Sequence, residues 1–201
     1  MILNMERPIE FQGADSIASV SCDPDRILDL VRMAHRGHRD AFGLLYEEYS
    51  SRVYRYVYMH TGQVELAEDL SQEVFIKALN SIGSYRDQGK PFLGWLLRIA
   101  HNLLIDHYRW LSRHPSVGLA GTVPVSKDDP VAEVEKRAEI TKVLQALPEL
   151  SPSQREVISL RFGAGLHLDE TAAAMGKSVG AVKMLQHQAV SSLKKMLGAG
   201  L

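Results

Sequence analysis

Cysteine is almost absent from this chain of 201 residues, which has a single one, Cys22. One cysteine cannot close an intrachain disulfide or supply a structural zinc site alone, which favours a reducing compartment. Long apolar runs are lacking too, since no stretch approaches the roughly 18 apolar residues of a membrane span. Residues 1–20 carry mixed charge and no sustained apolar core, so they match neither a signal peptide nor an anchor. We therefore expect a soluble, cytoplasmic protein without membrane insertion.

An excess of either charge is also missing. Lys and Arg number 23 against 24 Asp and Glu, which gives a formal net charge of −1. The total therefore lacks the strong basicity typical of many nucleic-acid-binding domains. A balanced sum can still conceal a basic surface beside an acidic one, so the distribution of charge along the chain has to be examined.

The apolar–polar alternation of half-buried strands is not found in the sequence, whereas helix start and stop signals are frequent. These signals predict helices over residues 24–36, 40–60, 64–80, 91–110, 130–147, 152–163, 168–175 and 178–197. The start signal of the helix predicted from residue 152 is a capping box, in which Ser151 is the N-cap residue and Gln154 follows three residues later.

Turn residues without periodicity fill residues 112–130, which indicates a linker. We predict an all-α fold with two helical domains joined by this flexible linker. The expected boundaries are a disordered N-terminal extension at 1–22, a first domain at 23–111, the linker at 112–130 and a second domain at 131–201.

The last two predicted helices, joined by a turn at Gly176, have the layout of a helix-turn-helix. One face of the second helix is apolar and is expected to pack on the domain: Val179, Val182, Leu185, Ala189, Leu193 and Met196. The other face is free to enter a major groove and carries Gly180, Lys183, Met184, His187, Gln188 and Ser191. From Thr171 onward the only charged residues are lysines. A helical hairpin used only for packing shows the same pattern, so this motif alone leaves both interpretations open.

The helix over residues 64–80 has the opposite polarity. Its apolar side carries Ala67, Leu70, Val74, Phe75 and Ala78, and its other side carries Glu65, Glu68, Asp69, Gln72 and Glu73, with Ile76 at the edge. This face is either a docking surface for a basic partner or an ordinary solvated face. Nothing nearby in the sequence supplies a nucleophile, which disfavours acid–base catalysis.

The helix over residues 91–110 is apolar nearly all round, but one narrow polar stripe runs along it: Trp95, Arg98, Asn102, Asp106 and Arg109. The two arginines can meet phosphates, Asn102 can hydrogen-bond a base edge, and Trp95 can stack on an unpaired base. Asp106 would repel DNA, so we expect it to orient one of the arginines. An internal salt-bridge stripe with a core tryptophan gives the same spacing.

Three segments carry a resemblance to a known family. They read AEDLSQEVFIKA over residues 67–78, FLGWLLRIAHN over residues 92–102, and LSPSQREV over residues 150–157 followed by the helix-turn-helix from Leu168 to His187. The first two resemble region two, and the third region four, of bacterial RNA polymerase sigma factors of the extracytoplasmic-function subfamily of the sigma-seventy family. The resemblance covers about residues 25–197, with the blocks in the family's order and a linker where the family lacks region three.

The resemblance implies an alternative sigma factor that binds core RNA polymerase and directs promoter recognition, melting and transcription initiation at a specific regulon. It assigns core polymerase binding to Glu68, Asp69, Leu70, Gln72, Glu73, Val74 and Ile76. It assigns the minus-ten element to Tyr85, Arg86, Lys90, Trp95, Arg98, Asn102 and Arg109. It assigns the minus-thirty-five element to Ser178, Gly180, Lys183, Met184, His187 and Gln188. The partners so implied are polymerase and promoter DNA, and an anti-sigma factor remains open as a third.

The chain departs from the family's pattern in the recognition helix, and two other interpretations of its function stay open. Where many members carry Arg in the recognition helix, this chain has Met184, Gln186 and Gln188, so the family's base contacts cannot be copied. A stand-alone helix-turn-helix regulator would explain the C-terminal half only. An enzyme would depend on the pairs His35 with His38 or Asp106 with His107, which lack a third ligand nearby and a nucleotide-binding loop. We therefore expect no enzymatic activity, no catalytic residue, no metal and no cofactor.

Overall fold

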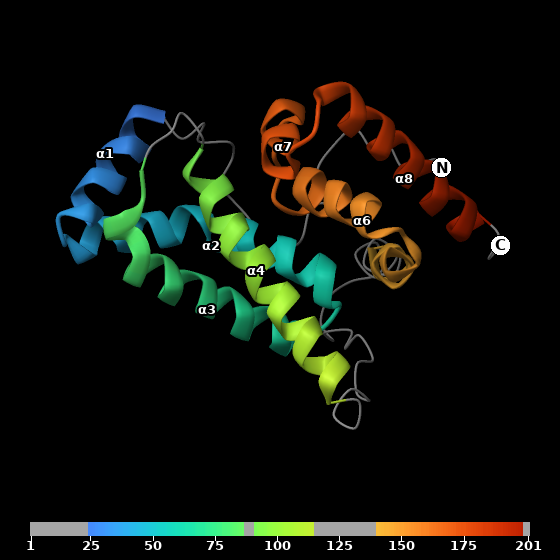
Figure 1. Ribbon diagram of the computed structural model, residues 1–201, viewed down its shortest axis with the longest axis horizontal. Helices are drawn as coiled ribbons and strands as arrows, with labels where there is room; N and C mark the ends of the chain where they lie inside the picture. Colours follow the sequence, from blue (N-terminus) through green and yellow to red (C-terminus); the bar gives the residue numbers. More distant parts are fainter. Residues whose placement is uncertain (1–23, 87–90, 115–139, 199–201) are drawn as a thin grey trace, which may run out of the picture.

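The computed structural model describes residues 24–86, 91–114 and 140–198, and within these ranges the ordered elements are all helices (Figure 1). The all-α prediction is therefore confirmed. The extension at residues 1–22, most of the predicted linker and the start of the helix predicted from residue 130 lie outside the described residues.

The first half consists of α1 (Pro24–His35), α2 (Arg39–Thr61), α3 (Val64–Ser81), the 3-10 turn η1 (Ile82–Ser84) and α4 (Phe92–Arg113). Gly62 ends α2 in the left-handed conformation, with φ of 66°, and its N–H donates to the carbonyl of Tyr58. The linker was predicted to begin at residue 112, but α4 continues to Arg113, because the N–H of His114 still reaches the carbonyls of Trp110 and Leu111.

The core of this half is built around α2, which packs against α1, α3 and α4 (Figure 1). Val53, Tyr56 and Val57 of α2 are completely buried, as are Val74 of α3 and Leu96 of α4. Burying an aliphatic side chain of this size contributes roughly 1.5–3 kcal/mol. The apolar stripes of the sequence therefore become the interior of a helical bundle.

The second half begins with helical residues 140–146 and the 3-10 turn η3 (Leu147–Glu149). Then follow α6 (Pro152–Ile158), a single π-helical turn η4 (Ser159–Gly163), α7 (Leu168–Met175) and α8 (Val179–Gly198). The capping box is confirmed: the N–H of Gln154 donates to Ser151 Oγ at 3.4 Å, and the N–H of Ser151 donates to Gln154 Oε1 at 3.1 Å. Gly176 ends α7 with φ of 62°.

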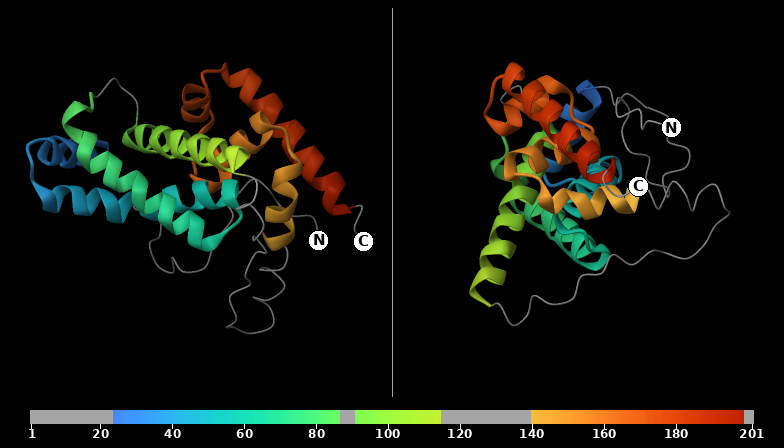
Figure 2. Two further views of the ribbon diagram at one scale, coloured as in Figure 1. Left: turned by 60° about the horizontal axis from the view of Figure 1, so that its bottom comes forward. Right: turned by 90° about the vertical axis from the view of Figure 1, so that its right-hand side faces the viewer.

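The two halves pack directly against each other, which the sequence did not predict. η4 lies against α2, and α7 approaches α4, as the two views of Figure 2 show. Apolar residues of both halves form one continuous buried cluster, in which Tyr56 and Val57 of α2 belong with Val157 and Ile158 of α6. The chain therefore folds as two helical units that share a common interior.

Candidate nucleic-acid interface

Helix α8 presents the polar face that the sequence predicted. Gly180, Lys183, Met184, His187, Gln188 and Ser191 are all exposed, and 64% of Met184 is accessible. On the opposite face Val182, Ala189 and Leu193 are buried against α6 and α7. The apolar arc is shorter than expected: Val179 is 40% exposed and Met196 37%, because they lie at the ends of the helix, beyond the layer of packed helices.

Local hydrogen bonds cap the N-terminal ends of both helices of the helix-turn-helix. Ser178, one of the expected DNA contacts, caps α8 by accepting from the N–H of Ala181 at 3.2 Å. At the start of α7 the N–H of His167 donates to Glu170 Oε2 at 2.7 Å, which is the half of the capping box that the sequence retains. Gln186 accepts a 3.1 Å hydrogen bond from Arg161 and is thereby turned toward the protein.

The polar stripe of α4 lies on the surface. Arg98, Asn102, Asp106 and Arg109 are exposed. Asp106 pairs with Arg109 at 3.6 Å, so the structure favours the expected orienting role of Asp106 over an internal salt-bridge stripe. Both side chains are about 70% accessible, and such an exposed pair adds little stability.

At the start of this stripe three aromatic side chains form a cluster. Trp95 is half-buried, with its ring centroid 5.1 Å from that of Tyr85 and 5.3 Å from that of Phe92. Phe92 is buried and was missed among the candidate residues, although its spacing of three from Trp95 places both on one helix face. Arg86 is exposed beside the cluster, and Lys90 lies outside the described residues.

Trp95, Arg98, His101 and Asn102 of α4 line one wall of a groove of about 840 Å³. The other wall belongs to α6 and α7 and includes Glu156, Glu170, Ala173 and Lys177. The proposed minus-ten residues Trp95, Arg98 and Asn102 therefore face the helix-turn-helix half across this groove.

The acidic face of α3 is exposed, as expected for Glu68, Asp69, Gln72 and Glu73, and Ile76 is 60% accessible among them. Glu73 pairs with Lys77 at 3.4 Å. Two residues assigned to polymerase binding do not share this surface. Leu70 and Val74 are buried, because they occupy the side of α3 that packs on the bundle. Their side chains therefore belong to the core and not to the exposed acidic face.

Neighbouring residues of α2 extend this surface, and they were not predicted from the sequence. Tyr46 is 44% exposed, and its ring lies edge-on to that of Phe75 at 4.7 Å. A shallow groove of about 230 Å³ runs between the two helices, lined among others by Tyr46, Glu68 and Gln72. The large number of tyrosines in α2 was the only sequence signal that could have indicated this extension of the surface.

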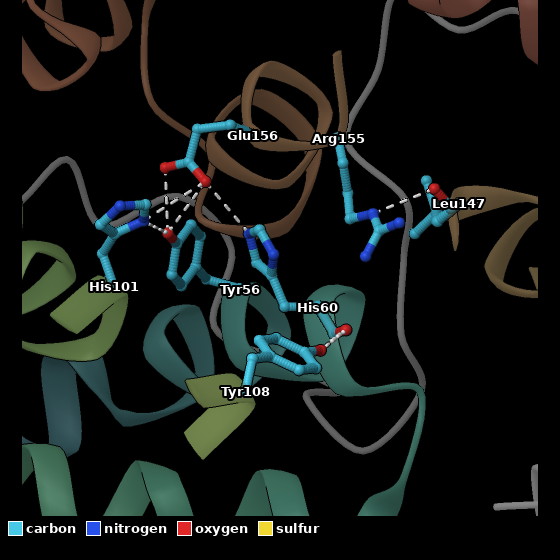
Figure 3. Close-up of polar contacts among 7 residues, drawn as sticks. All are labelled: Tyr56, His60, His101, Tyr108, Leu147, Arg155 and Glu156. Atoms are coloured by element: carbon cyan, nitrogen blue, oxygen red, sulfur yellow. Dashed lines mark hydrogen bonds and ion pairs between the residues drawn. The ribbon is translucent and has the colours of Figure 1, made fainter. Parts of the chain in front are cut away.

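A polar cluster lies between the two halves, where Glu156 of α6 meets side chains of α2 and α4 (Figure 3). The hydroxyl of Tyr56 donates to Glu156 Oε1 at 3.0 Å. His60 Nε2 lies 3.3 Å and His101 Nδ1 3.6 Å from Glu156 Oε2. Beside this cluster Tyr108 of α4 donates to the carbonyl of His60 at 2.5 Å.

The cluster changes the ionisation of its members. Burial by itself would raise the pKa of Glu156, but the hydrogen bonds and charges of His101 and His60 lower that pKa to about 2. The hydrogen bond to Glu156 raises the pKa of His101, although partial burial opposes this. Burial, followed by the charge of Glu156, raises the pKa of Tyr56 well above its usual value. The carboxylate is therefore held ionised at the centre of the contact.

Among the residues that the structure describes, no group of three or more His, Cys, Asp or Glu side chains is placed to hold a metal ion. The His35 with His38 and Asp106 with His107 pairs gain no further ligand from the described part of the fold. No helix in the described ranges is long and apolar enough to cross a membrane.

Comparison with known proteins places both halves in one family. The family model of Sigma-70 region 2 matches residues 45–114, and that of Sigma-70 region 4 matches residues 146–195. The ECF RNA polymerase sigma factor BldN of Streptomyces coelicolor is 42% identical over 180 residues, which cover 87% of this chain and 67% of that protein. The ECF RNA polymerase sigma factor SigD of Mycobacterium tuberculosis is 32% identical over 200 residues, covering 96% and 94%.

Solved structures include a similar fold. CnrH, determined in complex with the cytosolic domain of CnrY, superimposes with a TM-score of 0.65 at 28% identity, over 88% of this chain and 99% of that one. The matched regions contain the acidic face of α3, the stripe of α4 and the exposed face of α8. This chain belongs to the extracytoplasmic-function sigma factors of the sigma-70 family.

Proposed function

We propose that the chain acts as an alternative sigma factor, which binds core RNA polymerase through α3 and directs it to promoters through α4 and α8. The observation that carries this proposal is the separation of two exposed surfaces of opposite character on one chain. α3 presents Glu68, Asp69, Gln72 and Glu73, whereas α8 presents Lys183 and His187 with no acidic residue on its length. Acidic faces repel DNA, so the first surface suits a protein and the second suits a duplex.

Each surface has a defined role in this proposal. The acidic face, extended by Tyr46 and Ile76, docks on polymerase. The stripe of α4, with the aromatic cluster of Tyr85, Phe92 and Trp95, holds the melted minus-ten strand, since aromatic rings stack on unpaired bases. The exposed face of α8 enters the major groove at the minus-thirty-five element.

The chain would work by binding alone, as a specificity subunit of polymerase in the cytoplasm. A stand-alone regulator is disfavoured, because it would need neither the acidic face of α3 nor the stripe of α4. An anti-sigma factor is a further proposed partner, and the complex of CnrH with the cytosolic domain of CnrY supports a protein partner besides polymerase.

Transcription reconstituted from purified parts tests the proposal. The chain and core polymerase are combined, promoter fragments are selected from a random-sequence duplex library, and runoff transcripts are measured on the selected fragments. We expect specific transcripts that require both the chain and polymerase. Selection of fragments by the chain alone, with no gain from polymerase, would indicate the stand-alone regulator instead.

A further inference from the structure

Gln186 lies at the border between the buried and the exposed face of α8. One turn before it along the helix stand Val182, which is completely buried, and Lys183, which is exposed. Gln186 itself is half-buried. When a recognition helix lies in a major groove, the centre of its exposed face meets the base edges and its borders meet the phosphates on either side. The position of Gln186 therefore suits a contact with the DNA backbone.

Arg161 holds one end of the Gln186 side chain. It belongs to η4, and its Nε donates to Gln186 Oε1 at 3.1 Å. The Nη1 of the same guanidinium donates to the carbonyl of Leu166, which precedes α7. Because the guanidinium is planar and rigid, these two hydrogen bonds fix its orientation. Single π-helical turns such as η4 are frequent at functional sites, and here the turn ties the body of the domain to the recognition helix.

The hydrogen bond determines which chemistry Gln186 presents to a ligand of α8. A glutamine amide has an oxygen that accepts and a nitrogen that donates. Oε1 faces Arg161, so Nε2 is directed away from it, and no described residue accepts a hydrogen bond from Nε2. Glutamine reads adenine through its oxygen and its nitrogen together, which this orientation prevents. A phosphate oxygen only accepts, so it matches the donor that remains.

A purely structural tie to Arg161 would favour a different residue at this position. Glutamate would bind the guanidinium more strongly, because a carboxylate adds its charge to the hydrogen bond. The same charge would repel DNA. α8 has no acidic residue along its length, and the neighbour of Gln186 on its exposed side is Lys183. The neutral amide is thus the group that satisfies Arg161 on one side and an anion on the other.

We propose that Arg161 is a positioning residue for the minus-thirty-five element, which fixes the Gln186 amide so that Nε2 donates to one phosphate of the duplex beside Lys183. This inference rests on the proposed function of α8. Arg161 is half-buried and acts through Gln186. Its charge also polarises the amide, which strengthens the outer hydrogen bond.

Methylphosphonate substitution tests the contact one phosphate at a time. Core polymerase with the wild-type chain first selects a duplex fragment from a random-sequence library. Copies of that fragment then carry a neutral methylphosphonate at a single position of the minus-thirty-five element, and the affinity of the holoenzyme is measured for each copy. Loss of one hydrogen bond to a charged phosphate costs about tenfold in affinity.

Three variants are compared with the wild-type chain. Gln186→Met removes the amide at similar volume, and Arg161→Met removes the guanidinium but keeps an apolar stem. Arg155→Met is the matched control, because Arg155 also donates to two backbone carbonyls, that of Leu147 at 3.1 Å and that of Pro148 at 2.7 Å, but donates to no residue of α8. Thermal unfolding followed by circular dichroism reports the stability of each chain.

We expect one phosphate at which the wild-type chain and Arg155→Met lose about tenfold in affinity, whereas Gln186→Met and Arg161→Met lose nothing further, since this contact is already gone. At the other phosphates all four chains should respond alike. The slope of log K against log salt should stay unchanged in Gln186→Met, because a neutral amide releases no counterion. Lower stability alone would weaken binding to every copy equally and cannot produce this pattern.

A Gln186→Met chain that responds to every methylphosphonate as the wild type does would overturn the phosphate contact. If only Gln186→Met is insensitive and Arg161→Met responds as the wild type does, the positioning role of Arg161 is overturned. If Arg161→Met does not fold, Gln186→Asn decides, because its amide is one methylene too short to reach both partners, and a response like that of the wild type rejects the proposal.

The proposed function and this inference fail in different ways. A wild-type chain that selects no fragment with polymerase contradicts both. Successful selection, followed by variants that all respond as the wild type does, rejects the role of Arg161 and Gln186 alone.

Discussion

The hydroxyl of Tyr56 donates a 3.0 Å hydrogen bond to the carboxylate of Glu156, one hundred residues further along the chain (Figure 3). The tyrosine belongs to the half that carries the polymerase-docking face, and the glutamate belongs to the half that carries the helix-turn-helix. A buried hydrogen bond to a charged acceptor is stronger than one between neutral groups. The pair therefore joins two surfaces with different partners.

The contact of the two halves around Glu156 should be most stable between about pH 4.5 and 6.5. The pKa of Glu156 is lowered from 4.5 to about 2, so its contribution is complete above 4.5 and is lost as the pH falls toward 2. The pKa of His101 is raised from 6.5, so its contribution is complete below 6.5 and is lost as the pH rises through the raised value. Urea unfolding from pH 3 to 9 measures this profile.

Variants separate the two sides of the profile. His101→Gln should flatten the alkaline side only, and Glu156→Gln should flatten both sides. His107→Gln, at a half-buried position that does not contact Glu156, is the control for loss of a histidine from α4. A profile in which Glu156→Gln follows the wild-type chain would refute the assignment.

Reversing the charge of the acidic face should abolish polymerase binding. Asp69→Lys combined with Glu73→Lys replaces attraction for a basic partner by repulsion, while both side chains are exposed and the fold is retained. The control, Asp29→Lys with Asp40→Lys, makes the same change in net charge elsewhere on the exposed surface. Co-purification with core polymerase is the measurement, and equal recovery of both double variants would reject the docking face.

Lys183→Ala should weaken binding of the holoenzyme to duplex DNA that contains the minus-thirty-five element. One phosphate contact fewer lowers the dependence of log K on log salt by about one unit of slope. Lys194→Ala, on the same helix but further from the turn, should change the slope less. Runoff transcription that is insensitive to Lys183→Ala would exclude α8 from the groove at this position.

Trp95→Ala should impair promoter melting more than duplex binding. The two tryptophans of the chain lie on the same helix, so Trp110→Ala, at an exposed position, is a matched control. Trp95 also packs on Tyr85 and Phe92, and the thermal midpoint of each variant separates lost stability from lost stacking. A permanganate footprint that stays open with Trp95→Ala would contradict the assignment.

Sequence signals predicted the structure correctly where it is determined by residues that lie close together in the chain. The Ser151 capping box, the stop at Gly176 and the exposed face of α8 were all predicted correctly, because each depends on spacings of three or four residues. The same helical spacing placed Leu70 and Val74 on the apolar side of α3. Their assignment to the docking face came from the family motif and is corrected by their burial.

Contacts between distant segments could not be predicted in this way. Gly163 was interpreted as a helix stop, which is the usual meaning of glycine at that point. Its close approach to α2 is a property of the assembled fold. Glu156 lies within a motif of the family, yet its partners His60 and His101 come from other helices and share no spacing with it.

The closeness of Gly163 to α2 also restricts which residues can stand at this position. A Cβ at Gly163 would lie 2.7 Å from Met59 Sδ and 3.3 Å from the carbonyl oxygen of Arg55, so a larger residue would require its neighbours to shift. The contact of η4 with α2 therefore depends on the one residue type that has no side chain.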